Sequence, residues 1–526
     1  MKQIILSIIF FCNFVWFLNA QNSFIKVLDF SKTNEIAKQI LPFGDNFLVS
    51  YQHINNSYNR IFSGIMEIDK NANVIRDKRL IDFSNNFDAI VLDTIQSRIF
   101  YTGEEYTLTN IPQSFRIYEL DYNTLDSIMM VEVIDSIRIY PIIYQTNALI
   151  HNNQLVVAGQ GNTTGSHIMT AYLNLDDLSV DTITHIGEPE HPYSSISATT
   201  IYTGLDGSLV HHTKVFGDSI AIIKVDANKK IVQSVIQIET KCSKVRSWPA
   251  CLLSDGRSVY NRCGVDDLAE IVFLADSTYE IVDKFEWRKN LPQESPYPAR
   301  QGRKTFKLIE ARNGDIIGVG SIRWSDAPTP NIIHYAPLIF RINNKGELLW
   351  YKVLYNTSNI STATIGALYG VTELEDGSIM AVGDIRSDID YDPILERPVH
   401  QPDILIVRLS ADGCIDGYNC KDIFYKVPEV TSLTTSTQDV TLPTTKKHHI
   451  NVYPNPSSGF LTVALDDRYR RVMIGIYNMQ GQLIEKYYDL STEKIELNLS
   501  HLLTATYVYK IYDGAEVIKA GEWVKM

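Results

Sequence analysis

Closely spaced aspartates are the first residues in this chain whose type and spacing suggest chemistry. Asp384, Asp388, Asp390 and Asp392 fall within one short stretch, and carboxylate oxygens at such spacing are ligands that Ca2+ prefers. No glycine completes an EF-hand loop, so a solvated acidic loop is the alternative interpretation. We therefore predict that Asp388, Asp390 and Asp392 contribute to binding, with Ca2+ as a candidate ion and no assigned metal site.

Arg323 and Trp324, followed by Asp326, form a second candidate group. An exposed tryptophan presents a flat apolar face on which a sugar ring can stack, whereas a buried one packs within a sheet. Both interpretations stay open. The first makes Arg323 and Trp324 candidate glycan-binding residues.

The chain lacks the short motifs of common enzyme classes. It contains no His-Glu-x-x-His, no Gly-x-Ser-x-Gly and no phosphate-binding Gly-x4-Gly-Lys sequence. His211 and His212 are adjacent, as are His448 and His449, and adjacent side chains on a strand point to opposite faces. Neither pair can therefore hold one metal ion by itself. No catalytic residue is assigned, and an enzyme is the less favoured interpretation.

The six cysteines allow disulfide bonds if the chain is exported. Cys414 and Cys420 are close together and are predicted to form one bond. Cys251 and Cys263 flank an Asp-Gly turn and are predicted to bridge its two strands. No Cys-x2-Cys pair is present, so a zinc site is not expected, and Cys242 is interpreted as a small buried apolar residue.

A strand, an Asx-Gly turn and a second strand recur between residues 36 and about 425. One copy covers residues 306–320 around Asn313-Gly314, and the next covers residues 370–383 around Asp376-Gly377. Asx-Gly between alternating apolar residues is a strong hairpin signal, because both turn positions are expected to adopt positive φ. Further strands follow each hairpin, which predicts four antiparallel strands per repeat, the content of one propeller blade.

Fainter copies extend this repeat over the rest of the region. Their turns are spaced by roughly 50 to 60 residues, the range of propeller blades. The turn centres are Gly44, Ser97, Asn153, Gly207, Gly256, Gly314 and Gly377. The spacing predicts an all-β chain with a β-propeller of about seven four-stranded blades over residues 21–427. Six blades with an irregular first element, a β-sandwich array and a β-solenoid are the alternatives.

The charge balance argues against a nucleic-acid partner. The chain of 526 residues has a formal net charge of −13, whereas nucleic-acid binding requires clustered Lys and Arg. Apart from one N-terminal apolar run, no stretch approaches the length of a transmembrane helix.

A separate β-rich segment closes the chain. Residues 428–450 are rich in threonine and serine and lack an apolar period, so they are predicted to be a linker before residues 451–526. The segment opens with two prolines, which limit this entry to an extended edge. Its motif residues are Tyr453, Pro454, Asn455, Pro456, Gly459, Gly481 in a turn, the Leu499-Ser500-His501-Leu502 sequence and Tyr507.

These motifs, in this order, resemble the C-terminal sorting domain of proteins exported by the type IX secretion system of Bacteroidota. The glycine that usually precedes the last tyrosine is replaced within Thr504-Ala505-Thr506. The resemblance implies a small C-terminal β-sandwich sorting domain that a translocon at the outer membrane reads. It also implies a surface sortase that removes the domain and usually links the new C-terminus to an anionic lipopolysaccharide. The expected location is the outer cell surface or the medium, reached through the periplasm.

The N-terminus fits this route. Lys2 provides a positive charge, an apolar run extends from Ile4 to Leu18, and Ala20 is a small residue before Gln21. That pattern is typical of a cleaved secretory signal peptide, here residues 1–20. The apolar run is shorter than the ~20 residues that a membrane-spanning helix needs.

Three functions of different classes stay open. The first is a propeller that binds glycan or protein ligands, the second is a structural or adhesive protein used in gliding or biofilm, and the third is a glycan-degrading enzyme. Glycoside hydrolysis needs two carboxylates at a fixed separation, which spacing in sequence does not reveal. We expect the insertions after Gly320 and Gly383 to be loops on one face, where a rigid scaffold presents binding groups. The residues expected to share that surface are Arg323, Trp324, Asp388, Asp390 and Asp392.

Overall fold

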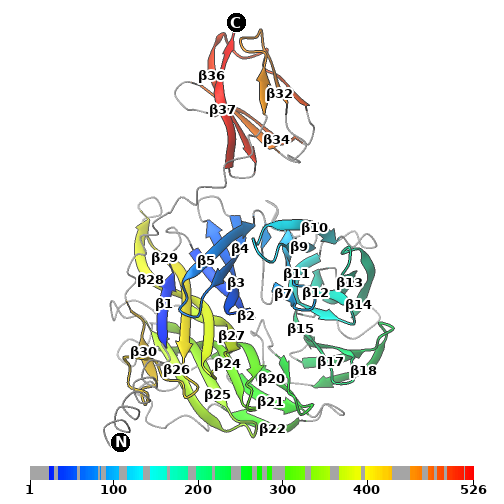
Figure 1. The fold of residues 1–526 in the computed structure, drawn as a ribbon, viewed down its shortest axis with the longest axis vertical. Helices are drawn as coiled ribbons and strands as arrows, with labels where there is room; N and C mark the ends of the chain where they lie inside the picture. The colour runs from blue at the N-terminus through cyan, green and yellow to red at the C-terminus, as the bar shows by residue number, and fades with distance from the viewer. Residues whose placement is uncertain are drawn as a thin grey trace, which may run out of the picture. The chain divides into compact units, whose positions relative to one another are not determined.

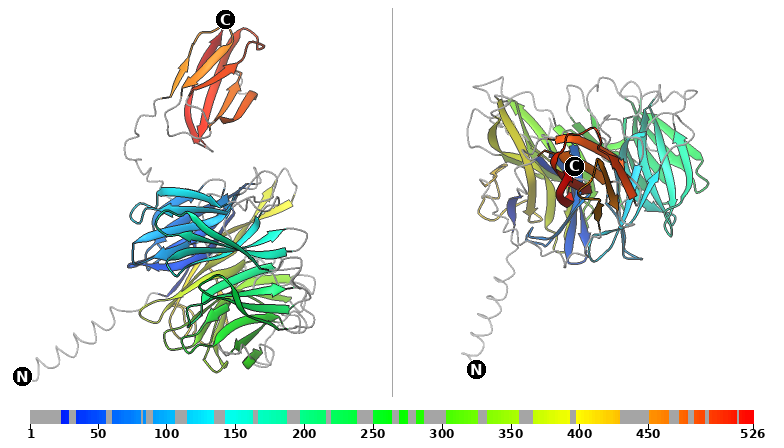
Figure 2. Two further views of the ribbon diagram at one scale, coloured as in Figure 1. Left: turned by 90° about the vertical axis from the view of Figure 1, so that its right-hand side faces the viewer. Right: turned by 90° about the horizontal axis from the view of Figure 1, so that it is seen from above.

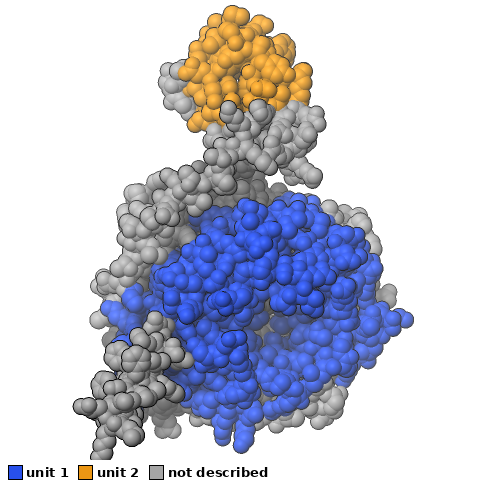
Figure 3. All heavy atoms as spheres, in the orientation of Figure 1, with its two compact units in different colours: residues 1–433 blue, residues 434–526 orange. Residues whose placement is uncertain are grey.

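The computed structural model describes most of the chain, and every regular element in the described part is a β-strand (Figure 1). The described residues are 23–28, 34–55, 60–80, 83–84, 90–105, 115–133, 142–162, 166–186, 197–215, 219–237, 250–263, 269–274, 281–286, 303–325, 333–355, 366–392, 397–428, 450–464, 472–478, 483–490, 494–513 and 516–526. They belong to two compact units, residues 1–433 and residues 434–526 (Figure 3). The predicted signal peptide and nearly all of the predicted linker lie outside the described residues.

The first unit is a seven-bladed β-propeller, which confirms the fold that the repeat predicted. The first blade contains β2 (Asn34–Phe43), β3 (Asn46–Asn55), β4 (Arg60–Ile68) and β5 (Val74–Leu80). The second contains β7 (Ile90–Asp93), β8 (Arg98–Glu105), β9 (Phe115–Leu120) and β10 (Ser127–Val133), with the short β6 (Phe83–Ser84) also paired to β8. The third contains β11 (Ile142–His151), β12 (Gln154–Asn162), β13 (Ser166–Asn174) and β14 (Val180–Ile186).

The remaining blades repeat this antiparallel order. The fourth contains β15 (Ser197–Thr203), β16 (Leu209–Val215), β17 (Ser219–Val225) and β18 (Ile231–Gln237). The fifth contains β19 (Ala250–Leu252), β20 (Ser258–Cys263), β21 (Ala269–Leu274) and β22 (Ile281–Glu286). The sixth contains β23 (Arg303–Glu310), β24 (Ile316–Ser325), β25 (Ile333–Ile342), β26 (Leu348–Tyr355) and β30 (Phe424–Lys426). The seventh contains β27 (Gly366–Glu373), β28 (Ile379–Asp392), β29 (Arg397–Leu409) and β1 (Phe24–Leu28).

The N-terminal strand closes the ring. β1 pairs antiparallel with β29 and supplies the fourth strand of the seventh blade. The chain beyond β29 instead adds β30 parallel to β26 at the edge of the sixth blade. Ser23 and Asp416 fasten the two segments together, because Ser23 N donates to Asp416 Oδ2 at 3.2 Å and Asp416 N donates to Ser23 Oγ at 2.8 Å.

Apolar residues between neighbouring blades form the core. Both faces of a blade are covered by the next blades, so a central strand is apolar throughout and does not alternate. Residues 404–407 of β29 show this, since all four are fully buried. Val382 and Ile406 of the seventh blade pack against Val49 and Met66 of the first, which makes the closing seam part of a continuous core.

The Asx-Gly turns have a different geometry from the one expected. At Asp206-Gly207 only the glycine has positive φ, 76°. Gly207 N donates to Gly204 O at 2.9 Å, and Gly204 N donates to Ser208 O at 2.8 Å. This is a type I turn followed by a bulge at the glycine. Asn152-Asn153 does adopt the two-residue turn, with φ values of 48° and 59°.

The first strand of each blade lies nearest the centre of the ring, and several of these inner strands carry a β-bulge (Figure 1). The pairing of β2 with β3 skips Lys38, that of β23 with β24 skips Phe306, and that of β27 with β28 skips Tyr369. A bulged residue leaves the hydrogen-bond ladder and its side chain is re-aimed. The bulges therefore re-aim the side chains of Lys38, Phe306 and Tyr369.

The second unit is a small β-sandwich, as predicted. One sheet contains β31 (Asn451–Tyr453), β32 (Phe460–Ala464) and β35 (Lys494–Asn498). The other contains β34 (Leu483–Leu490), β33 (Val472–Tyr477), β36 (Ala505–Asp513) and β37 (Glu516–Lys525). Leu461, Ile476, Ile511 and the fully buried Trp523 belong to the core between them.

The cysteines differ in part from the prediction. Cys414 and Cys420 form a disulfide, with Cα atoms 4.8 Å apart, between β29 and β30. Cys251 is a free thiol, so the predicted bridge from Cys251 to Cys263 is wrong. The register gives the reason. Cys251 lies opposite Val259, and the first residue of β19, Ala250, lies opposite Tyr260. Cys263 is three residues beyond Tyr260, so it lies past the end of this pairing. Burial raises the pKa of the Cys251 thiol to about 11.

Candidate functional site

The predicted binding residues lie on strands, and their assignment to loops is corrected. Arg323 and Trp324 belong to β24, opposite Tyr335 and His334 of β25. The strand continues past Gly320, where the sequence had suggested an end, because Ile322 keeps the apolar alternation and is buried. The side chains of Arg323 and Trp324 are outside the described part.

Asp388, Asp390 and Asp392 likewise belong to β28, opposite Gln401, Val399 and Arg397 of β29. The hairpin is long, since β28 has 14 residues and β29 has 13, whereas β12 and β13 of the third blade have 9 each (Figure 2). The extra length carries the three aspartates beyond the level at which the other blades end. Their side chains are outside the described part.

The two hairpins belong to neighbouring blades and turn on the same side of the ring. Each joins the second strand of a blade to the third, and equivalent connections of antiparallel blades lie on one face. Val319 and Ile339 of the sixth blade pack with Leu368 and Ile385 of the seventh. The backbone thus places both groups on adjoining blades, and a shared binding surface stays a prediction.

Three bulged residues from consecutive blades form a row that sequence reasoning missed. The rings of Phe306 on β23 and Tyr369 on β27 have centroids 4.9 Å apart. Lys38 Nζ, on β2, lies 4.4 Å from the centroid of the Tyr369 ring, an arrangement that attracts the ammonium to the aromatic face. All three side chains are half-buried, so the row crosses the closing seam with part of its surface accessible.

One carboxylate lies beside this row. Asp384 of β28 is 6% exposed, and its Oδ1 has no hydrogen-bond partner. Burial raises the pKa of Asp384 to about 6, although Lys38, a hydrogen bond with Tyr369 and the charge of Arg386 oppose the rise. Desolvation lowers the pKa of Lys38 to about 8, and the Asp384 charge opposes that fall. Burial and then the charge of Asp384 raise the pKa of Tyr369 well above its usual value.

The cluster of Lys38, Tyr369, Asp384 and Arg386, which we call the seam cluster, is therefore electrostatically unusual. Shifted pKa values in several interacting side chains are typical of functional sites, although ion-pair networks that serve stability share them. Near neutral pH two cations face one carboxylate. A buried acceptor without a donor costs free energy.

The tight approach of the blades holds this cluster in place. A Cβ added at Gly370 of β27 would lie 2.9 Å from Gln39 Cα of β2, so only glycine lets these inner strands come so close. Gln39 in turn exchanges hydrogen bonds with Ile90 of the second blade, at 3.0 Å and 2.7 Å. The bulge at Lys38 is thus fixed from both sides.

A sequence signal for the row exists. The apolar alternation slips by one residue at Lys38, within Ile36-Ala37-Lys38-Gln39-Ile40, and again at Tyr369 ahead of Gly370. Such a slip marks a bulge, but it does not show that three bulges meet. Asp384 was recognised as a candidate only together with the downstream aspartates.

No group of three or more His, Cys, Asp and Glu within the described residues is arranged to hold a metal ion. The side chains of Asp388, Asp390 and Asp392 lie outside the described part, so a Ca2+ site there stays a prediction. No helix in the described part is long and apolar enough to cross a membrane.

The sorting-motif residues lie in the second unit. Asn455 Nδ2 donates to Glu522 O at 2.6 Å, and Val524 N donates to Asn455 Oδ1 at 2.9 Å, so the motif asparagine binds the last strand. Pro454 and Pro456 flank it, both after cis peptide bonds. Tyr507 is buried and donates from its hydroxyl to Leu503 O at 2.9 Å. Gly481 lies outside the described residues.

Comparison with known proteins assigns the second unit. Residues 451–521 match the family described as secretion system C-terminal sorting domain. A search of curated protein sequences finds no match to the chain.

Solved structures resemble the chain only distantly. The quinohemoprotein alcohol dehydrogenase from Comamonas testosteroni is 9% identical, with a TM-score of 0.42, over 76% of this chain and 78% of that one. A europium-containing methanol dehydrogenase is also 9% identical, with a TM-score of 0.41, over 73% of this chain and 93% of that one. Likeness at this level carries no argument about activity.

Proposed function

Because its C-terminal domain sends the chain through the type IX secretion system to the cell surface or the medium, we propose that the propeller acts there as a binding module for glycan or protein ligands. The seam cluster is the observation that carries this proposal. Together with the adjoining ring of Phe306, it provides two aromatic faces, two cations and an oxygen of Asp384 that has no hydrogen-bond partner. Aromatic faces and buried polar groups of this kind fix the orientation of small ligands.

The chemistry of the cluster favours an acidic glycan. Hydroxyl groups donate to a carboxylate such as Asp384, sugar rings stack on aromatic faces such as Tyr369, and an anionic substituent is attracted by Lys38 and Arg386. The long β28–β29 hairpin and the end of β24 would extend this site along the same face. Arg323, Trp324, Asp388, Asp390 and Asp392 are the residues proposed to contact the outer part of the ligand, with Ca2+ as a candidate bridge.

Binding is favoured over glycoside hydrolysis for a specific reason. Hydrolysis by the usual mechanism requires two carboxyl groups about 5 to 10 Å apart. The groups that act on the pKa of Asp384 are an ammonium, a phenol, a guanidinium and the backbone of Ala367, and none of them is a second carboxyl group.

The test is a glycan array probed with the full mature chain, with and without Ca2+. Tyr369→Ala and Lys38→Met should each weaken binding of the captured glycan by at least about tenfold, the effect of one well-placed contact. Trp324→Ala and Asp390→Asn should weaken it in the same way if the outer part of the surface takes part.

Ile128→Ser on the outer strand of the second blade is the matched control, because Ile128 is 62% exposed and its blade contributes no residue to the seam cluster. Unchanged binding in Tyr369→Ala and Lys38→Met would rule out the seam cluster. Release of a shortened glycan would favour the enzyme instead. Retention of cells on a surface without any captured glycan would favour the adhesive alternative.

A further inference from the structure

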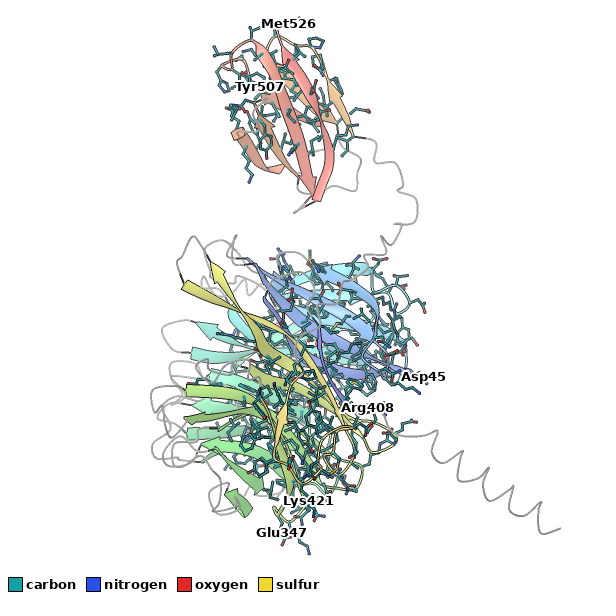
Figure 4. The ribbon with its side chains drawn as sticks, turned by 90° about the vertical axis from the view of Figure 1, so that its left-hand side faces the viewer. Asp45, Glu347, Arg408, Lys421, Tyr507 and Met526 are labelled. Carbon is teal, nitrogen blue, oxygen red and sulfur yellow. A yellow bond between two sulfur atoms is a disulfide. The ribbon has the colours of Figure 1, made fainter. Side chains whose placement is uncertain are left out.

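Added strands of the same chain cover the outer edges of two blades. β1 lies along the edge of β29, with Phe24 opposite Arg408 (Figure 4). β30 lies along the edge of β26, with Phe424 opposite Val353. The first of these pairings is antiparallel and the second is parallel, so the outside of this ring accepts a further strand in either direction.

The outermost strands of the other five blades differ in charge. An exposed sheet edge invites pairing with another chain, and charged side chains are a common protection against it. Four of the five strands carry such residues. They are Arg76, Asp77, Lys78 and Arg79 in β5, Glu132 in β10, Asp181 in β14, and Asp283, Lys284 and Glu286 in β22.

β18 is the exception. Its sequence, Ile-Val-Gln-Ser-Val-Ile-Gln, contains no charged residue and no proline. It pairs with β17 on one side and, within the described residues, with no strand on the other. Ile231 is 50% exposed and Val232 is 55% exposed, and the two point to opposite faces of the strand. β18 also lies on the outside of the ring (Figure 1), where another molecule can approach it.

The numbering of β18 restricts how a second copy of the strand could pair with it. In a two-fold symmetric antiparallel pair, opposed residues point their side chains to the same face of the sheet. Because side chains alternate along a strand, two identical strands satisfy this rule only if the numbers of opposed residues add to an even sum. The register centred on Ser234 satisfies it and pairs all seven residues of β18.

This register opposes compatible residues. Val232 lies opposite Ile236 of the second copy, once on each side of the central pair of Ser234 residues. Cross-strand pairs of β-branched residues stabilise a sheet, and no charge opposes another charge or an apolar residue. The remaining pairs are Gln233 with Val235 and Ile231 with Gln237.

We propose that β18 is a dimerisation edge, at which a second copy of this chain adds its own β18 antiparallel in the register centred on Ser234. The ladder would join the two fourth blades into one continuous sheet. An edge without charge offers no complement to a charged peptide, whereas its own copy brings no charge to it. One strand pair buries less than the roughly 1,600 Å² of a standard interface, so the dimer should dissociate on dilution.

Dimerisation would have a consequence for ligand binding. A dimer carries two seam clusters, and a glycan with repeated units could occupy both and bind with avidity. This consequence rests on the proposed function, but the dimer itself does not, because β18 contributes no residue to the seam cluster.

The experiment is sedimentation equilibrium of the full mature chain over a series of concentrations. Wild type should change from monomer to dimer as the concentration rises. Ser234→Lys places two lysines opposite each other, which should raise the dissociation constant of the dimer at least about tenfold. Ile128→Lys is the matched control, because Ile128 is 62% exposed on β10, another outermost strand, and this variant should dimerise as wild type does.

A charge exchange tests the register. Ser234→Glu should also be monomeric by itself, whereas an equal mixture of Ser234→Lys and Ser234→Glu should form a mixed dimer. Ser234 is exposed, so both variants should melt at the temperature of wild type. Amide hydrogen exchange of residues 231–237 should slow as wild type dimerises.

Three results would overturn the proposal. Wild type that stays monomeric at every soluble concentration would exclude a second copy as the occupant of this edge. Equal dimerisation of Ser234→Lys and wild type would place the interface elsewhere on the chain. A mixture of the lysine and glutamate variants that stays monomeric would exclude the register centred on Ser234.

Discussion

At the scale of single residues, the surroundings of His211 and His212 determine their charge state. Both are fully buried in β16, and none of their ring nitrogens has a hydrogen-bond partner. His212 packs on Tyr260 of the fifth blade, with ring centroids 4.5 Å apart. Burial lowers the pKa of His211 to about 4 and that of His212 to about 3. Both are neutral core residues at physiological pH.

These histidines predict sensitivity to acid. Below the ordinary histidine pKa of about 6.5 the unfolded chain binds protons that the folded chain refuses until pH about 4 and 3. The contribution of each neutral histidine to the free energy of unfolding is therefore fully present above pH 6.5. It is lost as the pH falls toward the folded-state pKa, by an amount on the order of 3 kcal/mol per histidine. The melting temperature of the propeller, measured from pH 7.5 to 4.5, should fall less steeply in His212→Phe. Parallel curves for wild type and variant would contradict this assignment.

The disulfide predicts a local effect. Its loop has a sequence separation of 6, so closing it contributes only about 2 kcal/mol. Lys352 Nζ also holds the loop, donating to Cys420 O and Asp422 O at 2.6 Å each. Cys414→Ser should therefore increase protease cleavage between β29 and β30 and leave the ring folded. Non-reducing peptide mapping should recover Cys414 joined to Cys420, and alkylation of both thiols in exported protein would refute the bond.

At the scale of elements, the bulges and the closing strand matter most. Bulges on β2, β23 and β27 produce the aromatic row, and β1 makes the seventh blade complete. Lys26 of β1 also donates to Ala72 O at 2.8 Å and to Asn73 Oδ1 at 3.0 Å, which ties the strand to the first blade. The closing strand thus connects both sides of the seam that holds the candidate site.

Removal of β1 should open that seam. Deletion of residues 23–28 exposes the edge of β29 and removes the buried Leu28. The propeller should melt at a markedly lower temperature, because loss of one buried leucine side chain alone costs about 2 to 5 kcal/mol. A synthetic peptide of residues 23–28 added in excess should restore part of the loss by pairing with β29. An unchanged melting temperature after the deletion would show that the seam does not depend on β1.

At the scale of the molecule, the two units have separate hydrophobic cores and separate roles. The propeller core and the core around Trp523 belong to different units. The C-terminal unit determines export, and the propeller is proposed to bind. Independent cores allow either function to be lost without the other.

Deletion of residues 452–526 should therefore leave a folded propeller in the periplasm. Fusion of the same residues to a reporter should export the reporter. Localisation by fractionation, with circular dichroism of the retained propeller, would test both parts. A surface-exposed propeller that lacked the C-terminal unit would contradict the sorting role. An intact C-terminus on the mature surface protein would contradict the proposed removal by a sortase.

The sequence alone determined the fold class and the export route. Asx-Gly turns at a regular spacing require hairpins whatever surrounds them, since only a few residues tolerate positive φ. The opening motif Tyr453-Pro454-Asn455-Pro456 and the later Leu499-Ser500-His501-Leu502 are local patterns, and they were sufficient to identify a sorting domain. Cys414 and Cys420 are close enough in the chain that proximity needed no tertiary information.

Only the tertiary structure decided which residues meet. Lys38, Tyr369 and Asp384 are brought together by ring closure, which joins the first blade to the last, and no local pattern encodes that contact. The pairing register separates Cys251 from Cys263, and continued alternation past Gly320 keeps Trp324 on a strand. Contacts between residues hundreds of positions apart depend on how whole sheets pack and close. Ordering the chain for such a contact costs conformational entropy, and the apolar burial that offsets this cost is complete only in the closed ring.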